Sequence, residues 1–146
     1  SGYSGGDTNN PTYGLVNTKL TGHAETIEVV YDPNEISFSN LLDVYFGSQN
    51  IDQINGQGPD MGPQYRSIIF YQNNTQKTII ESKIDKIESK KNLKVAAEVY
   101  PFRKFWVAEE YHQNFKKNNP NHPYIKNVSN PRFKNFKFKF EDLIKD

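Results

Sequence analysis

The stretch RSIIFYQNNTQKTIIESKIDKIESKKNLKVAAEVY, residues 66–100, decides the fold class because its periodicity changes twice. Residues 66–72 and 95–100 are rich in β-branched and aromatic side chains, which favours two strands. Between them, residues 75–91 place isoleucines three and four positions apart and carry Lys and Glu on the other face. The stretch therefore predicts a strand, an amphipathic helix and a second strand.

The flanking sequence extends this pattern in both directions. Residues 26–31, TIEVVY, predict another strand, and Ser37 is a suitable N-cap for a helix over 38–47. We expect a further helix over 105–117, and a last one that begins at Asn130-Pro131 and continues through Phe133, Phe136, Phe140 and Leu143. Residues 1–17 and 48–64 are expected to be loops. This order of elements predicts an α/β or α+β domain whose helices pack on one small sheet.

Composition restricts what such a domain can be. The 146 residues fit a single domain, and the net charge of +1 gives no argument for nucleic acid or membrane partners, so we expect neither. The absence of cysteine excludes disulfides, thiolate zinc sites and a thiol nucleophile within this chain. The first residue is Ser1 in a loop-like stretch, so we expect the start of the protein to be missing, and with it any targeting signal.

Two polar stretches could carry chemistry. In residues 10–25, Glu25 directly precedes a predicted strand and could be held there in a fixed, partly buried position, or it could simply be solvated at the strand end. In residues 56–67, GQGPDMGPQYRS, glycines and prolines fix the backbone around Asp60 and Tyr65. That stretch lacks the phosphate-binding GxxxxGK[ST] pattern, and a rigid structural loop is the alternative.

Two further stretches are better explained by packing. FWVAEEYHQNF, residues 105–115, lacks the HExxH pattern, so we expect no metal and a helix that packs Trp106 and Phe115 into the core. The C-terminal RFKNFKFKFEDLIK interleaves Lys with Phe, as single-strand-binding segments do, but its spacing favours an amphipathic helix with a solvated basic face.

Six segments together resemble the A-type peptide methionine sulfoxide reductase family (MsrA) in order and spacing. They are GYSGGDTNNPTY, TGHAE, VVYDPNEISFSNLL, NGQGPDMGPQYRSIIF, AEEYHQNF and NPNHPYI, and they span essentially the whole chain. The resemblance implies one domain over residues 1–146 with a two-layer, ferredoxin-like fold that lacks its first strand. It also implies that the family's nucleophilic cysteine, in a GCFW motif upstream of the GYSGG loop, lies outside this chain.

The resemblance implies roles for individual residues. Glu25, Tyr13, Tyr65 and Asp60 match the polar site residues of the family, with Glu25 as the acid that protonates the sulfoxide oxygen. Phe115 and Tyr124 match substrate-binding positions. The implied reaction is the reduction of methionine-S-sulfoxide, free or in oxidised proteins, through a sulfenic acid. No cofactor is implied beyond an external thiol such as thioredoxin or dithiothreitol, since the tail offers no second cysteine.

The same resemblance sets the remaining expectations. We expect a monomer in the cytoplasm, inactive as the 146-residue chain alone because nothing in it can attack sulfur. The alternative is a non-catalytic module that binds methionine sulfoxide, or a degenerate relative without the cysteine. The residues immediately upstream of Ser1 discriminate between the two.

Overall fold

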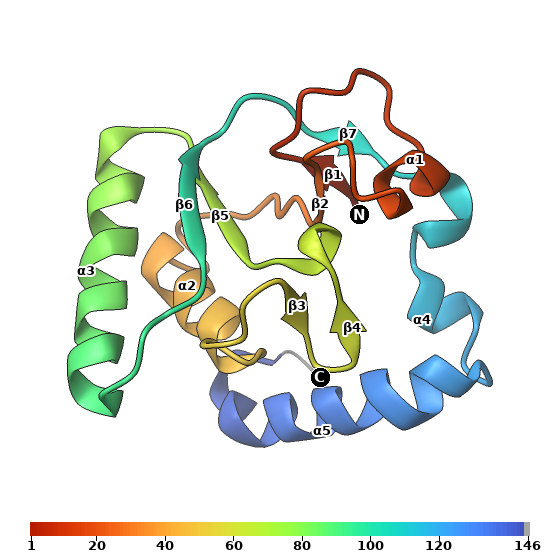
Figure 1. Ribbon diagram of the computed structural model, residues 1–146. Coiled ribbons are helices and arrows are strands. Elements are labelled where there is room, and N and C mark those ends of the chain that lie inside the picture. Colours follow the sequence, from red (N-terminus) through yellow and green to blue (C-terminus); the bar gives the residue numbers. More distant parts are fainter. Residues whose placement is uncertain (145–146) are drawn as a thin grey trace.

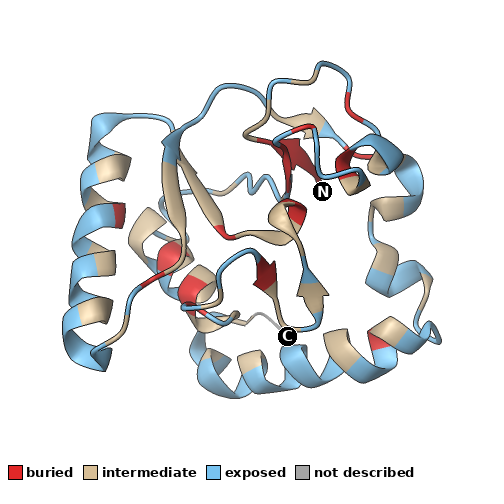
Figure 2. Ribbon diagram, viewed as in Figure 1, coloured by how far each residue is buried: buried red, intermediate tan, exposed pale blue. Residues whose placement is uncertain are grey.

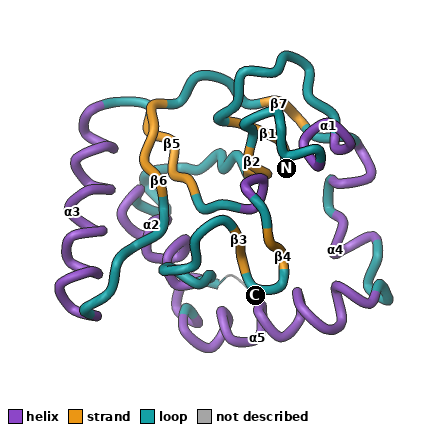
Figure 3. Tube along the Cα trace, in the orientation of Figure 1, coloured by secondary structure: helices purple, strands orange, loops and turns teal. Residues whose placement is uncertain are grey.

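The computed structural model, which describes residues 1–144, is a mixed α/β protein, so the predicted fold class is confirmed (Figure 1). The strands do not form a single sheet. In the described part of the chain they form three: β2-β1-β7, β3-β4 and β5-β6 (Figure 3). The pairs β1–β2 and β1–β7 are antiparallel, whereas β5 and β6 are parallel.

The strand–helix–strand unit that the sequence predicted is present. β5 (Ile68–Tyr71) leads through α3 (Asn74–Lys91) to β6 (Glu98–Pro101), and the long helix permits the two strands to run parallel. The Asn73 side chain caps α3 by accepting a hydrogen bond from the Gln76 N–H at 2.9 Å. Asn92 ends the helix in the left-handed conformation.

The larger of two apolar cores lies between this unit and α2 (Phe38–Gly47), which Ser37 caps as predicted. Its buried residues are Leu42, Phe46, Ile51, Ile80 and Val95. A smaller core surrounds β1 (Gly2–Ser4) and consists of Tyr3, Val16 and Ala108, with Trp106 and Tyr13 packed against it. Figure 2 shows the two groups of buried residues on separate parts of the ribbon.

Three predictions for the first half of the chain were wrong in detail. Residues 1–17 contain β1 and the short helix α1 (Tyr13–Asn17) instead of forming only a loop. The strand predicted over 26–31 is β2 (Ala24–Thr26), because only these residues face β1 in register. The loop predicted over 48–64 contains the hairpin of β3 (Gly56–Gln57) and β4 (Asp60–Met61), followed by a 3₁₀ turn, η1 (Pro63–Tyr65).

The helix predicted over 105–117 was also wrong. Those residues form β7 (Trp106–Val107), the 3₁₀ turn η2 (Glu110–His112) and the short helix α4 (Phe115–Asn118). Trp106 pairs with Tyr3 of β1, and this long-range pairing overrides the local helical pattern. The last helix, α5 (Asn130–Lys139), continues directly from a π-helical turn, η3 (Ile125–Ser129), so Asn130 is helical and not an N-cap. A 3₁₀ turn, η4 (Glu141–Leu143), follows α5.

Candidate active site

The candidate site lies where β1, β2 and η2 meet. The antiparallel register places Tyr3 of β1 opposite Glu25 on one side and Trp106 on the other. Beside this row is a cleft of about 280 Å³, lined by Ser1, Tyr3, Tyr13, Glu25, Ala108 and His112 among others. Two of the four predicted polar residues, Tyr13 and Glu25, therefore share one cleft.

Glu25 differs from an ordinary surface glutamate. The residue is exposed to solvent, as in the second of the two alternatives that the sequence left open. Nevertheless, the protein around it desolvates the carboxyl, and the negative charge of Asp60 adds to that effect, so the pKa of Glu25 is raised. A raised pKa keeps part of the Glu25 population protonated at higher pH, which is what a proton donor needs.

Asp60, Tyr65 and Tyr124 form the other half of the site. The Tyr124 hydroxyl donates to Asp60 Oδ2 at 2.5 Å, and burial together with this acceptor raises the pKa of Tyr124 to about 12. Burial, followed by the charge of Glu25, also raises the pKa of Tyr65. The charges of Glu25 and Asp60 and the hydroxyl of Tyr13 all act on the pKa of Tyr65. The four predicted polar residues therefore belong to one electrostatic cluster.

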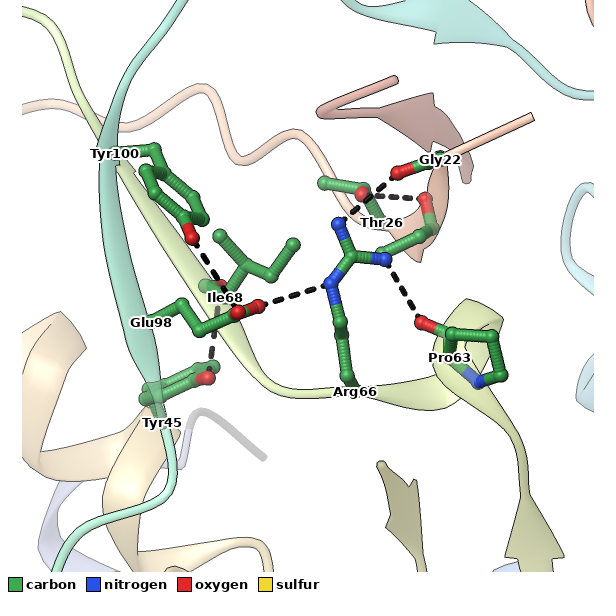
Figure 4. A network of polar contacts seen from close by, with 9 residues as sticks. Gly22, Thr26, Tyr45, Pro63, Arg66, Ile68, Glu98 and Tyr100 are labelled. Atoms are coloured by element: carbon green, nitrogen blue, oxygen red, sulfur yellow. Dashed lines mark hydrogen bonds and ion pairs between the residues drawn. The ribbon is translucent and has the colours of Figure 1, made fainter. Parts of the chain in front are cut away.

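Arg66 fixes the position of this second half (Figure 4). Its guanidinium donates three hydrogen bonds. Nε–H donates to the Glu98 carboxylate of β6 at 2.9 Å, Nη1–H to the Pro63 carbonyl at 2.8 Å, and Nη2–H to the Gly22 carbonyl at 2.9 Å. One side chain thereby connects the β5–β6 sheet, the η1 turn and the turn before β2. Tyr65 directly precedes Arg66, and Glu25 follows Gly22 by three residues, so Arg66 connects the two segments that carry these site residues.

Glu109 organises the first half, although the sequence analysis assigned it no role. Its carboxylate accepts hydrogen bonds from the Tyr3 hydroxyl at 3.1 Å, the Tyr111 hydroxyl at 2.9 Å and the Tyr13 N–H at 3.0 Å. Although desolvation raises the pKa of Glu109, these donors outweigh it, with the Tyr13 N–H first, and the net pKa is lowered. Glu109 is therefore a fixed anion that anchors Tyr13 in the cleft.

His112 is the second residue in the cleft that was not predicted. Its ring lies 4.6 Å from the ring of Tyr13 and 4.2 Å from that of Tyr111, centroid to centroid. Its Nε2 is buried and, within residues 1–144, has no hydrogen-bond partner. The stretch FWVAEEYHQNF was interpreted as a core helix without a metal motif and as part of the family resemblance, but neither interpretation gave His112 a role.

The two predicted substrate residues are placed differently. Tyr124 joins the site through Asp60. Phe115 begins α4, is half-buried, and has its ring 5.3 Å from that of His122 rather than against the four polar residues. Within residues 1–144 no group of three or more His, Asp or Glu side chains could hold a metal ion, and no helix there is long and apolar enough to cross a membrane.

Two carboxylates of shifted pKa and several tyrosines around a cleft define an enzyme-like site on a mixed α/β domain. The family model described as "Peptide methionine sulfoxide reductase" matches residues 1–143, and the chain belongs to this family.

Similar proteins agree with this assignment. The chain is 44% identical over 141 residues to the peptide methionine sulfoxide reductase MsrA of Sulfolobus acidocaldarius, covering 97% of this chain and 80% of the relative. It is 42% identical to that of Pasteurella multocida, covering 99% of this chain and 83% of the relative. Among solved structures, reduced Mxr1 from Saccharomyces cerevisiae superimposes with a TM-score of 0.78 at 31% identity, covering 83% of this chain and 70% of that one. Methionine sulfoxide reductase A of Corynebacterium diphtheriae gives 0.72 at 31% identity, with 83% and 63% covered.

Proposed function

We propose that the complete protein reduces methionine-S-sulfoxide, free or in oxidised proteins, to methionine. The observation that carries the proposal is the cluster of Glu25, Tyr13, Tyr65 and Asp60, in which a carboxyl of raised pKa lies among tyrosines that can hold an oxygen. The nucleophilic cysteine is supplied by a segment outside this chain. Family membership supports that assignment, because the chain spans 80% of the Sulfolobus relative.

The proposed step gives each residue a task. A cysteine thiolate attacks the sulfoxide sulfur, and negative charge develops on the oxygen as the S–O bond weakens. Protonated Glu25 transfers its proton to that oxygen, while the tyrosine hydroxyls donate hydrogen bonds to it. The S–O bond breaks as the bond between the two sulfurs forms, and hydroxide leaves with the proton from Glu25. Hydroxide then attacks the cysteine sulfur and breaks the bond to the substrate sulfur. The products are methionine and a cysteine sulfenic acid, so the substrate sulfur is reduced by two electrons and the cysteine is oxidised by two.

An external thiol then completes the cycle. One thiol of the reductant attacks the sulfenic sulfur and releases water, and a second thiol of the reductant, such as that of thioredoxin or dithiothreitol, frees the cysteine as a disulfide forms. We propose this external route because the 146 residues contain no cysteine that could resolve the sulfenic acid. The protein acts as a monomer in this scheme.

The test compares two forms of the protein with methionine-S-sulfoxide and dithiothreitol. The complete protein, including the residues upstream of Ser1, should release methionine, whereas residues 1–146 alone should release none. Turnover by the 146-residue chain would overturn the thiol mechanism. If the upstream segment carries serine or glycine at the cysteine position and the complete protein binds the sulfoxide without reducing it, the protein is a binding module.

A further inference from the structure

The charges of this protein are segregated. Residues 113–140 contain seven Lys and Arg residues and no Asp or Glu. The remaining 118 residues hold the other 11 cations and all 17 acidic residues, which leaves that part with a net charge of −6. The overall charge of +1 therefore conceals a strongly basic segment on an acidic body. We call residues 113–140 the basic segment.

The cations of the basic segment are exposed and have no carboxylate partners, although Lys116 lies over the Phe133 ring and Lys139 donates to the Gly47 carbonyl at 3.5 Å. All seven are solvent-exposed, and within residues 1–144 none of them forms an ion pair. In residues 1–112, by contrast, five of the ten Lys and Arg residues pair with a carboxylate. Clustered like charges without counter-ions raise the energy of the folded protein, so they favour contact with an anionic partner.

The basic segment runs along the candidate site. It starts immediately after His112 of the cleft and carries Lys116 and Lys117 in α4. It then supplies Tyr124, which bonds Asp60 at 2.5 Å. The Arg132 guanidinium of α5 lies against Gly58 of the β3–β4 turn, where a Cβ would come within 2.8 Å of Nη2. Figure 1 shows α4 on one side of the β3–β4 hairpin and α5 below it.

The shape of the segment favours an extended polypeptide over other anions. The cations lie along α4 and α5, which run in different directions. A flexible chain can follow both helices, whereas a partner with one flat face cannot. A lipid surface would need a free apolar helix face, but Phe140 packs against Gly47 and Phe136 is half-buried, which leaves Phe138 at 89% exposed and Phe133 at 48%. Single-stranded nucleic acid would need a series of free rings, and Lys116 covers the ring of Phe133 at 4.0 Å.

We propose that the basic segment selects methionine sulfoxide residues that lie in acidic, extended stretches of polypeptide. The neutral sulfoxide side chain enters the site, whose own carboxylates are Glu25, Asp60 and Glu109, and the acidic flanking residues lie outside it along the lysines. This inference rests on the proposed function, since it names the sequence context of that function's substrate.

The test uses three peptides of equal length in which a central methionine-S-sulfoxide is flanked by Glu, by Gln or by Lys. Binding is measured with residues 1–146, and kcat/KM with the complete protein and dithiothreitol, a neutral reductant that keeps the thiol step constant. The variant K126Q/K134Q/K137Q removes three exposed charges of the basic segment. Its matched control, K86Q/K90Q/K91Q, removes three exposed charges of α3 on another side of the molecule.

We expect kcat/KM and affinity for the Glu-flanked peptide to exceed those for the Lys-flanked peptide by roughly tenfold at low salt. The difference should fall to about twofold in the basic-segment variant and at about 1 M salt, where the Debye length is roughly 3 Å, but persist in the control. Equal values for the three peptides, or equal losses in both variants, would overturn the inference. Binding of an oligonucleotide or of anionic vesicles more tightly than the acidic peptide would also overturn it. Absence of turnover with every peptide would refute the proposed function while the binding comparison still tests the inference.

Discussion

Replacing Glu109 by alanine should destabilise the protein far more than its surface position suggests. Tyr3 is only 2% exposed, so its hydroxyl would lose its acceptor in a place that water enters poorly, at a cost of about 1–3 kcal/mol. The half-buried Tyr13 would also lose the acceptor of its N–H, which costs about 1 kcal/mol. Tyr111 is exposed, and water replaces its partner. The free energy of unfolding should therefore fall by about 3 kcal/mol, and Tm by roughly 10 °C for a chain of this size.

Urea unfolding followed by fluorescence measures this loss directly. Trp106 is the single tryptophan and packs against the core that contains Tyr3, so its emission reports on this part of the structure. Glu110→Ala is the control, because the neighbouring Glu110 is exposed. Because hydrogen bonding lowers the pKa of Glu109, its stabilisation is present above the pKa of the unfolded chain and is lost as pH falls through the folded value. The difference between the wild type and Glu109→Gln should shrink accordingly in acid. Equal urea midpoints for Glu109→Ala and Glu110→Ala would refute the anchoring role.

Three other substitutions test the site and its frame. Glu25→Gln in the complete protein should lower kcat at neutral pH by about 100-fold with little change in KM. The wild-type rate should decrease as pH rises through the raised pKa of Glu25, and this decrease should be absent in the variant. An unchanged rate would exclude Glu25 as the acid. Asp60→Asn should lower the pKa of Tyr124 from about 12, because the negative charge disappears and the hydrogen bond is left with a neutral, weaker acceptor. Ultraviolet titration of the tyrosinates, with Tyr124→Phe to identify the signal, would contradict the hydrogen bond if the curve did not move. Gly6→Ala should cost about 3 kcal/mol in urea unfolding, since its Cβ would collide with the Thr21 carbonyl and the His23 N–H. Gly14→Ala, where the Cβ meets only Thr12 Oγ1 at 4.0 Å, is the matched control, and similar losses in both would show that the collision is relieved.

The parts of the fold that the sequence predicted well are those that local chemistry determines. The helices of residues 38–47 and 74–91 have side-chain caps at Ser37 and Asn73 and a regular apolar stripe. Residues close in the sequence therefore determine where each helix begins. The short strands are different, because β1, β2 and β7 have two or three residues each and exist only through pairing with one another. A helical pattern over 105–117 cannot reveal that Trp106 will face Tyr3 about one hundred residues earlier in the chain.

The candidate site shows the same limit. Glu25, Tyr13, Tyr65 and Asp60 were identified through resemblance to a family, not through any spacing that marks them as neighbours. Glu109 and His112 were assigned no role, since a glutamate that accepts from the distant Tyr3 and Tyr13 looks the same in sequence as one that is solvated. Arg66 follows the predicted Tyr65, yet its partners Gly22 and Glu98 lie 44 residues before it and 32 residues after it in the sequence.

Two glutamates near one cleft illustrate how the structure divides chemical tasks. Glu25 is desolvated and lies near the negative Asp60, so its pKa is raised and it can hold a proton. Glu109 accepts from the Tyr13 N–H and two tyrosine hydroxyls, so its pKa is lowered and it remains an anion. A pair of like groups with opposite shifts is the arrangement expected where one group transfers a proton and the other must not. Because its pKa is lowered, Glu109 keeps its negative charge and its hold on the Tyr13 N–H at pH values at which Glu25 can still be protonated. Glu25 can therefore change its protonation state while the frame that holds Tyr13 beside it stays fixed.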